Sequence, residues 1–97
     1  MKALFISYNQ AYNEEIVEVL EQFGQRGFTR WQEVQGRGGI DGIPRMGSHA
    51  WPEMNHVLLA MTDDDKVPAI LAELRKRDET APDLGLCAFV WNIESYY

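Results

Sequence analysis

Residues 33–55 read EVQGRGGIDGIPRMGSHAWPEMN, and the interpretation of the whole chain starts from this stretch. A strand-like start gives way to a segment, 36–55, that holds five glycines, two prolines, two arginines and one histidine. Loops of this length without periodicity are uncommon in small compact domains, and those that occur usually bind something or are disordered. The stretch therefore favours a binding or sensing role over catalysis.

The segments on either side of this loop alternate between strand-like and helix-like patterns. Strands are predicted over 2–8, 28–35, 56–62 and 86–93, and helices over 13–24 and 63–77. Asn13 and the run Asp63–Asp65 are expected to cap the two helices. This order predicts an α+β, ferredoxin-like β-α-β-β-α-β sandwich with a four-stranded antiparallel sheet and two helices on one face. Residues 1–97 are expected to form a single domain, with the loop 36–55 between the second and third strands.

The composition restricts the classes of partner. Nine basic residues stand against fifteen acidic ones, for a net charge of −6. Nucleic-acid binding needs a basic field, so no nucleic-acid partner is expected, and an anionic membrane surface is disfavoured for the same reason. No segment is long and apolar enough for membrane insertion. The single cysteine, Cys87, indicates a reducing compartment and a cytoplasmic protein, and its place in an alternating strand predicts an unreactive core thiol.

The strands carry large apolar side chains on both faces, including Trp31 and Trp91. With both helices on one face, a four-stranded sheet leaves its other face open to water. An apolar patch exposed on the other face would usually mark an interface. We therefore expect this face to pack against copies of the same chain in a closed oligomer.

Glycines and arginines in the loop suggest an anion site. Gly36, Gly38, Gly39 and Gly42 can form a nest of backbone N–H groups, with charge supplied by Arg37 and Arg45. The spacing is not a dinucleotide fingerprint and contains no phosphate-loop lysine motif. The alternative interpretation is a flexible loop in which the glycines only permit turns and the arginines keep it solvated.

Metal binding and catalysis receive less support from the residues. His49 and His56 are weak candidates for metal ligands, because one lies in the loop, the other begins a strand, and their separation matches no standard spacing. Ser48 beside His49 is not a nucleophile–base pair, so the protein is not expected to be an enzyme. Trp51 could stack on a planar ligand or anchor the returning loop by burial.

Two motifs carry a family resemblance. EVxGxG at 33–38 and PRxGSHxWP at 44–52, on a chain with this order of elements, resemble the P-II nitrogen-regulatory family and in particular its shorter P-II-like members. The resemblance covers the whole chain in the order of elements. The chain departs from the family at Gly39 and Ile40, where arginine and glutamine are usual, and over 79–85, which has one glycine and no lysine.

The resemblance implies a homotrimeric signalling protein with small-molecule effectors held in clefts between subunits. It implies that a small anionic ligand, such as an adenine nucleotide, is bound by residues around the first loop glycines: Gly36, Arg37, Gly38, Gly39 and Arg45. It also implies that the loop 36–55, with His49 and Trp51, is an effector surface for a protein target. No cofactor is certain. The alternatives are a metal-binding trimer similar to the divalent-cation-tolerance (CutA) proteins, which share this topology, and a trimeric adaptor that needs no small molecule.

Overall fold

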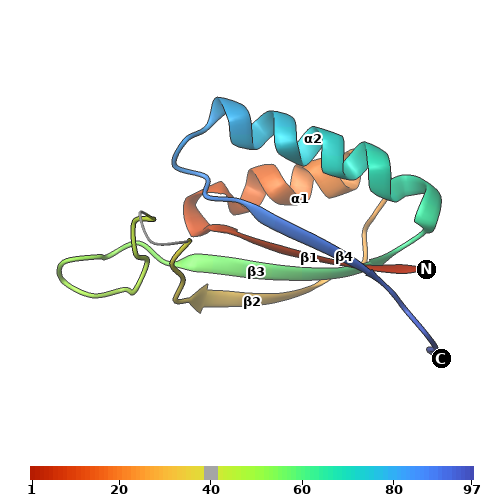
Figure 1. The fold of residues 1–97 in the computed structure, drawn as a ribbon, viewed down its shortest axis with the longest axis horizontal. Helices are drawn as coiled ribbons and strands as arrows, with labels where there is room; N and C mark the ends of the chain where they lie inside the picture. The colour runs from red at the N-terminus through yellow and green to blue at the C-terminus, as the bar shows by residue number, and fades with distance from the viewer. Residues whose placement is uncertain (39–41) are drawn as a thin grey trace.

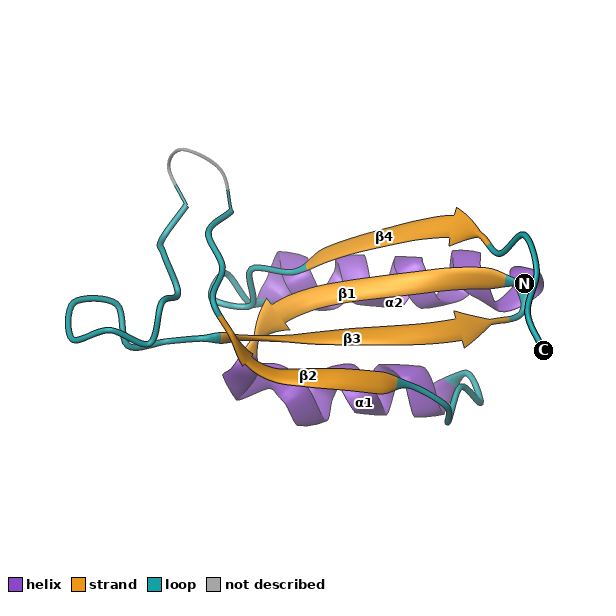
Figure 2. Ribbon diagram, turned by 90° about the horizontal axis from the view of Figure 1, so that it is seen from below, coloured by secondary structure: helices purple, strands orange, loops and turns teal. Residues whose placement is uncertain are grey.

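The computed structural model describes residues 1–38 and 42–97 of the chain. The strands are β1 (Lys2–Asn9), β2 (Thr29–Val34), β3 (Asn55–Thr62) and β4 (Cys87–Asn92). The helices are α1 (Asn13–Gln22) and α2 (Val67–Thr80), each preceded by a short 3-10 turn, η1 (Gln10–Tyr12) and η2 (Asp64–Lys66). The strands form one antiparallel sheet in the order β2-β3-β1-β4, and both helices cover the same face (Figures 1 and 2). The predicted fold class is therefore confirmed.

The core lies between the sheet and the two helices. Alternate residues of the central strands, such as Leu4 and Ile6 of β1 and Leu58 of β3, are fully buried against the helices. Helical spacing brings Ile16 and Leu20 of α1 into the same cluster, together with Ile70 and Leu74 of α2. Burial of these aliphatic groups is the main favourable contribution to folding.

Tyr8 is the largest side chain of the core and is fully buried. Its hydroxyl donates a hydrogen bond of 2.5 Å to Oδ1 of Asn13. Burial raises the pKa of Tyr8 to about 12, and the nearby charge of Arg30 opposes this shift. The neutral phenol is thus the form that the folded core accommodates.

Both predicted helix caps were wrong. Asn13 is the first residue of α1 rather than its cap, and its side chain accepts the hydrogen bond from Tyr8. Asn9 is the capping residue here, because its Oδ1 accepts from the N–H of Ala11 at the start of η1. The run Asp63–Asp65 lies in and before η2 and makes no side-chain capping bond. In both places a 3-10 turn precedes the α-helix, so the pattern located the helix but not the residue that begins it.

The face of the sheet away from the helices is apolar and uncovered in the single chain. Cross-strand pairing aligns Trp31 with Val57, and Phe5 with both Leu59 and Phe89. Trp91 pairs with Ala3 on the same face. Trp31, Phe89 and Trp91 are 47%, 58% and 48% exposed. We call this surface the open sheet face.

Cys87 belongs to this face, so the prediction of an unreactive core thiol was wrong. Its strand does alternate, but Ala88 and Val90 turn toward the helices while Cys87 is exposed. A period of two assigns residues to two faces without saying which face is covered.

Candidate functional site

The long loop begins where β2 leaves the sheet. A bulge separates Trp31 from Val34, and within it Glu33 adopts a left-handed backbone conformation with φ of 53°. The Glu33 N–H donates to Nδ1 of the buried His56 at 3.2 Å. Such a bulge bends a strand and redirects the chain that follows. Beyond the bulge, β2 still pairs with β3 at Val34 and Asn55, and the chain then enters the loop.

The base of the loop is closed by a pair of backbone hydrogen bonds. The Gly36 N–H donates to the carbonyl of Arg45 at 2.8 Å, and the Arg45 N–H donates to the carbonyl of Gly36 at 2.7 Å. A Cβ at Gly36 would overlap the side-chain amide of Asn55, so glycine is required for this close approach. The bridge closes residues 36–45, the first part of the loop, and the chain continues from Arg45 through a second turn to β3.

A cavity of about 470 Å³ lies between this loop base and the start of β4. Its lining comes from three segments that are far apart in the sequence. They are the loop (Gly36, Arg37, Gly38, Gly42, Ile43, Arg45), the central strands (Ser7, Asn55) and the region from α2 into β4 (Pro82, Gly85, Cys87, Phe89). The volume falls within the range that small-molecule ligands occupy in proteins.

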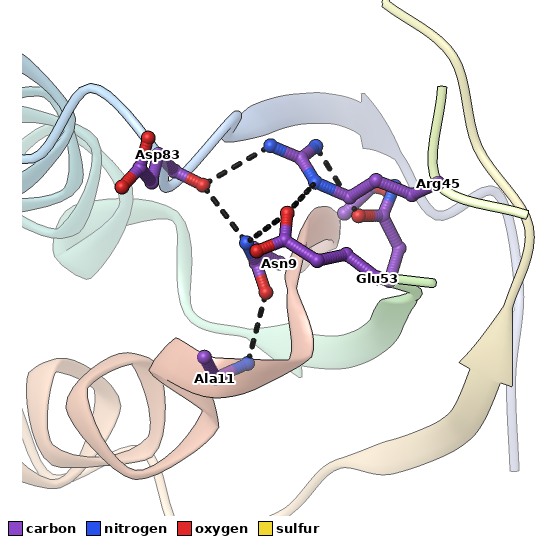
Figure 3. Close-up of polar contacts among 7 residues, drawn as sticks. Asn9, Ala11, Arg45, Glu53 and Asp83 are labelled. Carbon is purple, nitrogen blue, oxygen red and sulfur yellow. Dashed lines mark hydrogen bonds and ion pairs between the residues drawn. The ribbon is translucent and has the colours of Figure 1, made fainter. Parts of the chain in front are cut away.

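Arg45 is the most constrained charged group of the cavity. Its Nη2 donates to the carbonyl of Asp83 at 3.0 Å, and its Nη1 lies 3.4 Å from Oδ1 of Asn55. Glu53 places a carboxylate oxygen 3.7 Å from Nε, and the Arg45 side chain is 13% exposed (Figure 3). The guanidinium thus joins the loop to the turn before β4 and carries positive charge into the cavity wall.

Asn9 supports the same arrangement from the end of β1. Its Nδ2 donates to the carbonyl of Asp83 at 3.1 Å and lies 3.3 Å from a carboxylate oxygen of Glu53. Its backbone N–H donates to the carbonyl of Leu84 at 2.9 Å. Asn9 is 2% exposed, so these bonds are shielded from water (Figure 3).

The rest of the cavity combines open backbone with apolar surface. A Cβ at Gly38 would meet no described atom within 4 Å, so the backbone there faces free space. Phe89 and Ile43 are 58% and 65% exposed and offer apolar surface beside the charged groups. Cationic side chains near an aromatic ring and exposed backbone suit a ligand that has both an anionic group and a flat apolar part.

The structure brings together four of the five ligand residues expected from the sequence. Gly36, Arg37, Gly38 and Arg45 all line the cavity. Gly39 lies outside the described residues. The sequence did not predict the β4 side of the cavity, namely Gly85, Cys87 and Phe89, nor the lining residues Ser7, Ile43, Asn55 and Pro82. Only the isolated glycine at 85 gave a signal, because a glycine next to a strand often marks close backbone approach.

The outer part of the loop forms a separate turn that does not line the cavity. The carbonyl of Trp51 accepts from the N–H groups of Met46 and Ser48 at 3.3 and 3.0 Å. The Oγ of Ser48 accepts from the Trp51 N–H at 3.1 Å. His49 and Trp51, the expected effector residues, lie on this turn, and Trp51 is 44% exposed. A half-exposed indole leaves room for a partner and argues against burial as its main role.

In the part of the chain that the structure describes, no three His, Cys, Asp or Glu side chains are grouped so that they could hold a metal ion. Nδ1 of His56 accepts the Glu33 N–H, which leaves only the other ring nitrogen for any ligand role. None of the helices in residues 1–38 and 42–97 combines the length and the apolar character needed to cross a bilayer.

Comparisons with known proteins bear on the fold. The chain matches no protein-family model and no curated protein. Among solved structures it resembles CPII, a nitrogen regulatory PII-like protein from Thiomonas intermedia, bound to ADP, AMP and bicarbonate. That match has a TM-score of 0.79 and 21% identity over 95% of this chain and 84% of that chain. CPII bound to ADP and bicarbonate matches with a TM-score of 0.78 and 22% identity over the same shares.

A signalling protein described as PII-like, from Thermus thermophilus, matches with a TM-score of 0.67 and 22% identity. The match covers 95% of this chain and 84% of that chain. The chain is therefore a ferredoxin-like α+β protein, and within that class it has the fold of the PII-like proteins. The resemblance inferred from the two loop motifs is confirmed at the level of the fold.

Proposed function

We propose that this protein is a PII-like regulator that binds a small anionic ligand, with adenine nucleotides as the first candidates, in the cavity at the base of its long loop. The observation that carries this proposal is the convergence of Gly36, Arg37, Gly38 and Arg45 on one cavity. The similar CPII structures hold ADP, AMP and bicarbonate, which are anions of the class that this lining suits. An adenine ring would lie against Phe89 and Ile43, and its phosphates near the arginines.

We further propose that the protein works as a homotrimer. The open sheet face, with Trp31, Phe89 and Trp91 about half exposed, supports association, because a patch of this kind usually marks an interface. The cavity opens beside this face, since Cys87 and Phe89 belong to both. A neighbouring subunit would then complete the cavity as an intersubunit cleft.

The outer turn of the loop is the proposed surface for a protein target. It projects beyond the sheet (Figure 1) and presents His49 and the half-exposed Trp51. Exposed tryptophans are frequent anchors of protein interfaces. In this account the protein is a single-domain cytoplasmic sensor and not an enzyme, and ligand binding at the loop base changes what the outer turn presents.

Isothermal titration calorimetry with AMP, ADP, ATP and bicarbonate tests the ligand proposal. The wild-type protein is expected to bind at least one of the nucleotides. Arg37→Ala is expected to weaken that binding at least several-fold, which is the effect of losing one charge-assisted contact. Arg26→Ala is the matched control, because Arg26 is exposed in the turn after α1. Absence of binding by the wild-type protein, or equal affinity of the Arg37 and Arg26 variants, would contradict the proposal.

A further inference from the structure

Glu53 is the one carboxylate that the described contacts place against the guanidinium of Arg45. It lies on the returning arm of the loop, 3.7 Å from Nε of Arg45 and 3.3 Å from Nδ2 of Asn9. Its side chain is 58% exposed, whereas that of Arg45 is 13% exposed. Glu53 does not line the cavity, so it can influence a bound ligand through its charge and through its contacts with Arg45 and Asn9, but not by direct contact.

The contact between the two residues is an ion pair without a good hydrogen bond. A distance of 3.7 Å is too long for a hydrogen bond from Nε, and Nε of Arg45 is buried without a hydrogen-bond partner among the described residues. The other two nitrogens of the guanidinium are held by Asp83 and Asn55. Glu53 therefore neutralises the charge of Arg45 but does not saturate its donors.

Resting on the function proposed above, we infer that Glu53 is an internal counter-ion that competes electrostatically with the anionic ligand for Arg45. In the empty protein its carboxylate offsets the positive charge in the cavity wall. An anion that enters the cavity meets a guanidinium already balanced by Glu53, so the two anions weaken each other's interaction with Arg45. Glu53 is thus a positioning residue that sets the affinity for anions and does not itself contact the ligand.

The position of Glu53 links this competition to the outer turn. Its carbonyl accepts the N–H of Gly47 at 3.3 Å, so Glu53 is part of the turn that carries His49 and Trp51. If a bound ligand weakens the interaction between Arg45 and Glu53, that interaction must weaken ligand binding to the same extent, because coupling between two sites is reciprocal. A change in the interaction of Glu53 with Arg45 would then couple ligand binding in the cavity to the turn that carries His49 and Trp51.

Glu53→Gln tests the inference, because it removes the charge and keeps the shape and an acceptor for Asn9. Calorimetry would compare AMP, ADP and the uncharged nucleoside adenosine. We expect Glu53→Gln to bind AMP and ADP about two- to five-fold more tightly than wild type, the range of a partly exposed charge interaction, and to leave adenosine affinity unchanged. Glu21→Gln is the control, since Glu21 is an exposed carboxylate at the far end of α1.

A second measurement separates this inference from the proposed function. The NMR signal of the Arg45 Nε–Hε group is followed while inorganic phosphate is added to both proteins, and the half-saturating concentration is expected to be lower in Glu53→Gln. If Glu53→Gln has the lower half-saturating phosphate concentration but neither protein binds nucleotides, the nucleotide proposal is rejected and the counter-ion role of Glu53 is supported. The counter-ion inference would be overturned if Glu53→Gln had the same ratio of AMP to adenosine affinity as the wild-type protein. This includes the case in which it binds AMP, ADP and adenosine more tightly by the same factor. Loss of every response, with no effect of nucleotide or phosphate in either protein, would overturn both.

Discussion

Gly85 packs directly against the guanidinium of Arg45. A Cβ at Gly85 would stand 2.7 Å from Nη2 and 2.9 Å from Cζ of that side chain, and the backbone of Gly85 has a φ of 56°. The turn before β4 and the arginine of the loop therefore fit each other only because residue 85 has no side chain. The cavity depends on this contact between two segments that are forty residues apart.

Gly85→Ala should damage both the fold and the site. The left-handed φ and the overlap with Arg45 together should lower the free energy of unfolding by about 1–3 kcal/mol. Urea unfolding measures this loss. Gly27→Ala is the control, because a Cβ there would meet nothing closer than 4.0 Å and its φ is not positive. Equal stability of the two variants would show that the contact seen at Gly85 is unimportant.

The open sheet face should hold a trimer together. Light scattering at micromolar concentration should give three times the 11.1 kDa mass of one chain. Trp91→Glu should reduce the mass toward that of one chain, because it places a charge in an apolar interface. Ala72→Glu, on an exposed position of α2, should leave the mass unchanged. A wild-type mass equal to one chain would contradict the trimer.

Cys87 should report on occupancy of the cavity. Its thiol is exposed in the single chain and lines the cavity with Phe89, and the proposed trimer keeps this cavity open as an intersubunit cleft. Cys87 should therefore react with 5,5′-dithiobis(2-nitrobenzoate) in the ligand-free protein. Saturating AMP should slow this reaction several-fold, because the bound ligand limits access of the reagent to the thiol. The rate is measured from the absorbance of the released product at a constant AMP concentration. The same protection by adenosine alone would locate the base, and not the phosphate, beside Cys87. An unaltered rate in the presence of bound nucleotide would place the ligand elsewhere.

Tyr8 should make stability depend on pH in the alkaline range. Because burial raises its pKa from the ordinary 10.0 to about 12, the folded state disfavours the ionised phenol. The stabilising effect is fully present below pH 10 and is lost as the pH rises from 10 through 12. Compared with Tyr8→Phe, the wild-type protein should therefore lose more stability over that interval, as measured by urea unfolding at each pH. Parallel curves for the two proteins would reject this assignment.

Much of the fold could be predicted because its signals are local. Runs rich in apolar residues in β1 and β3 and the spacing of Ile16 and Leu20 in α1 locate the elements, and their order restricts the topology. The caps could not be predicted, because a 3-10 turn precedes each α-helix: the capping bond at η1 comes from Asn9 and not Asn13, and Asp63 precedes η2 and not α2. The choice of face for Cys87 was wrong because it depends on where the helices pack.

The candidate site also has a part that could be predicted from the sequence and a part that could not. Gly36, Arg37, Gly38 and Arg45 could be predicted as a group because they share one loop, which the bridge between Gly36 and Arg45 folds upon itself. The β4 side of the cavity could not, because Cys87 and Phe89 reach it through their register with Ser7 and Phe5 of β1. The contacts of Asn9 and Glu53 with Arg45 likewise depend on tertiary packing that no motif of the sequence encodes.

Backbone amide chemical shifts of the labelled protein, recorded while AMP is added, test the central claim most directly. If a small anion binds at the loop base, the largest changes should occur at Gly36, Arg37, Gly38, Gly85 and Cys87, and they should saturate with a single affinity. Changes confined to the helices or to the far end of the sheet, or no changes at millimolar AMP, would contradict the account.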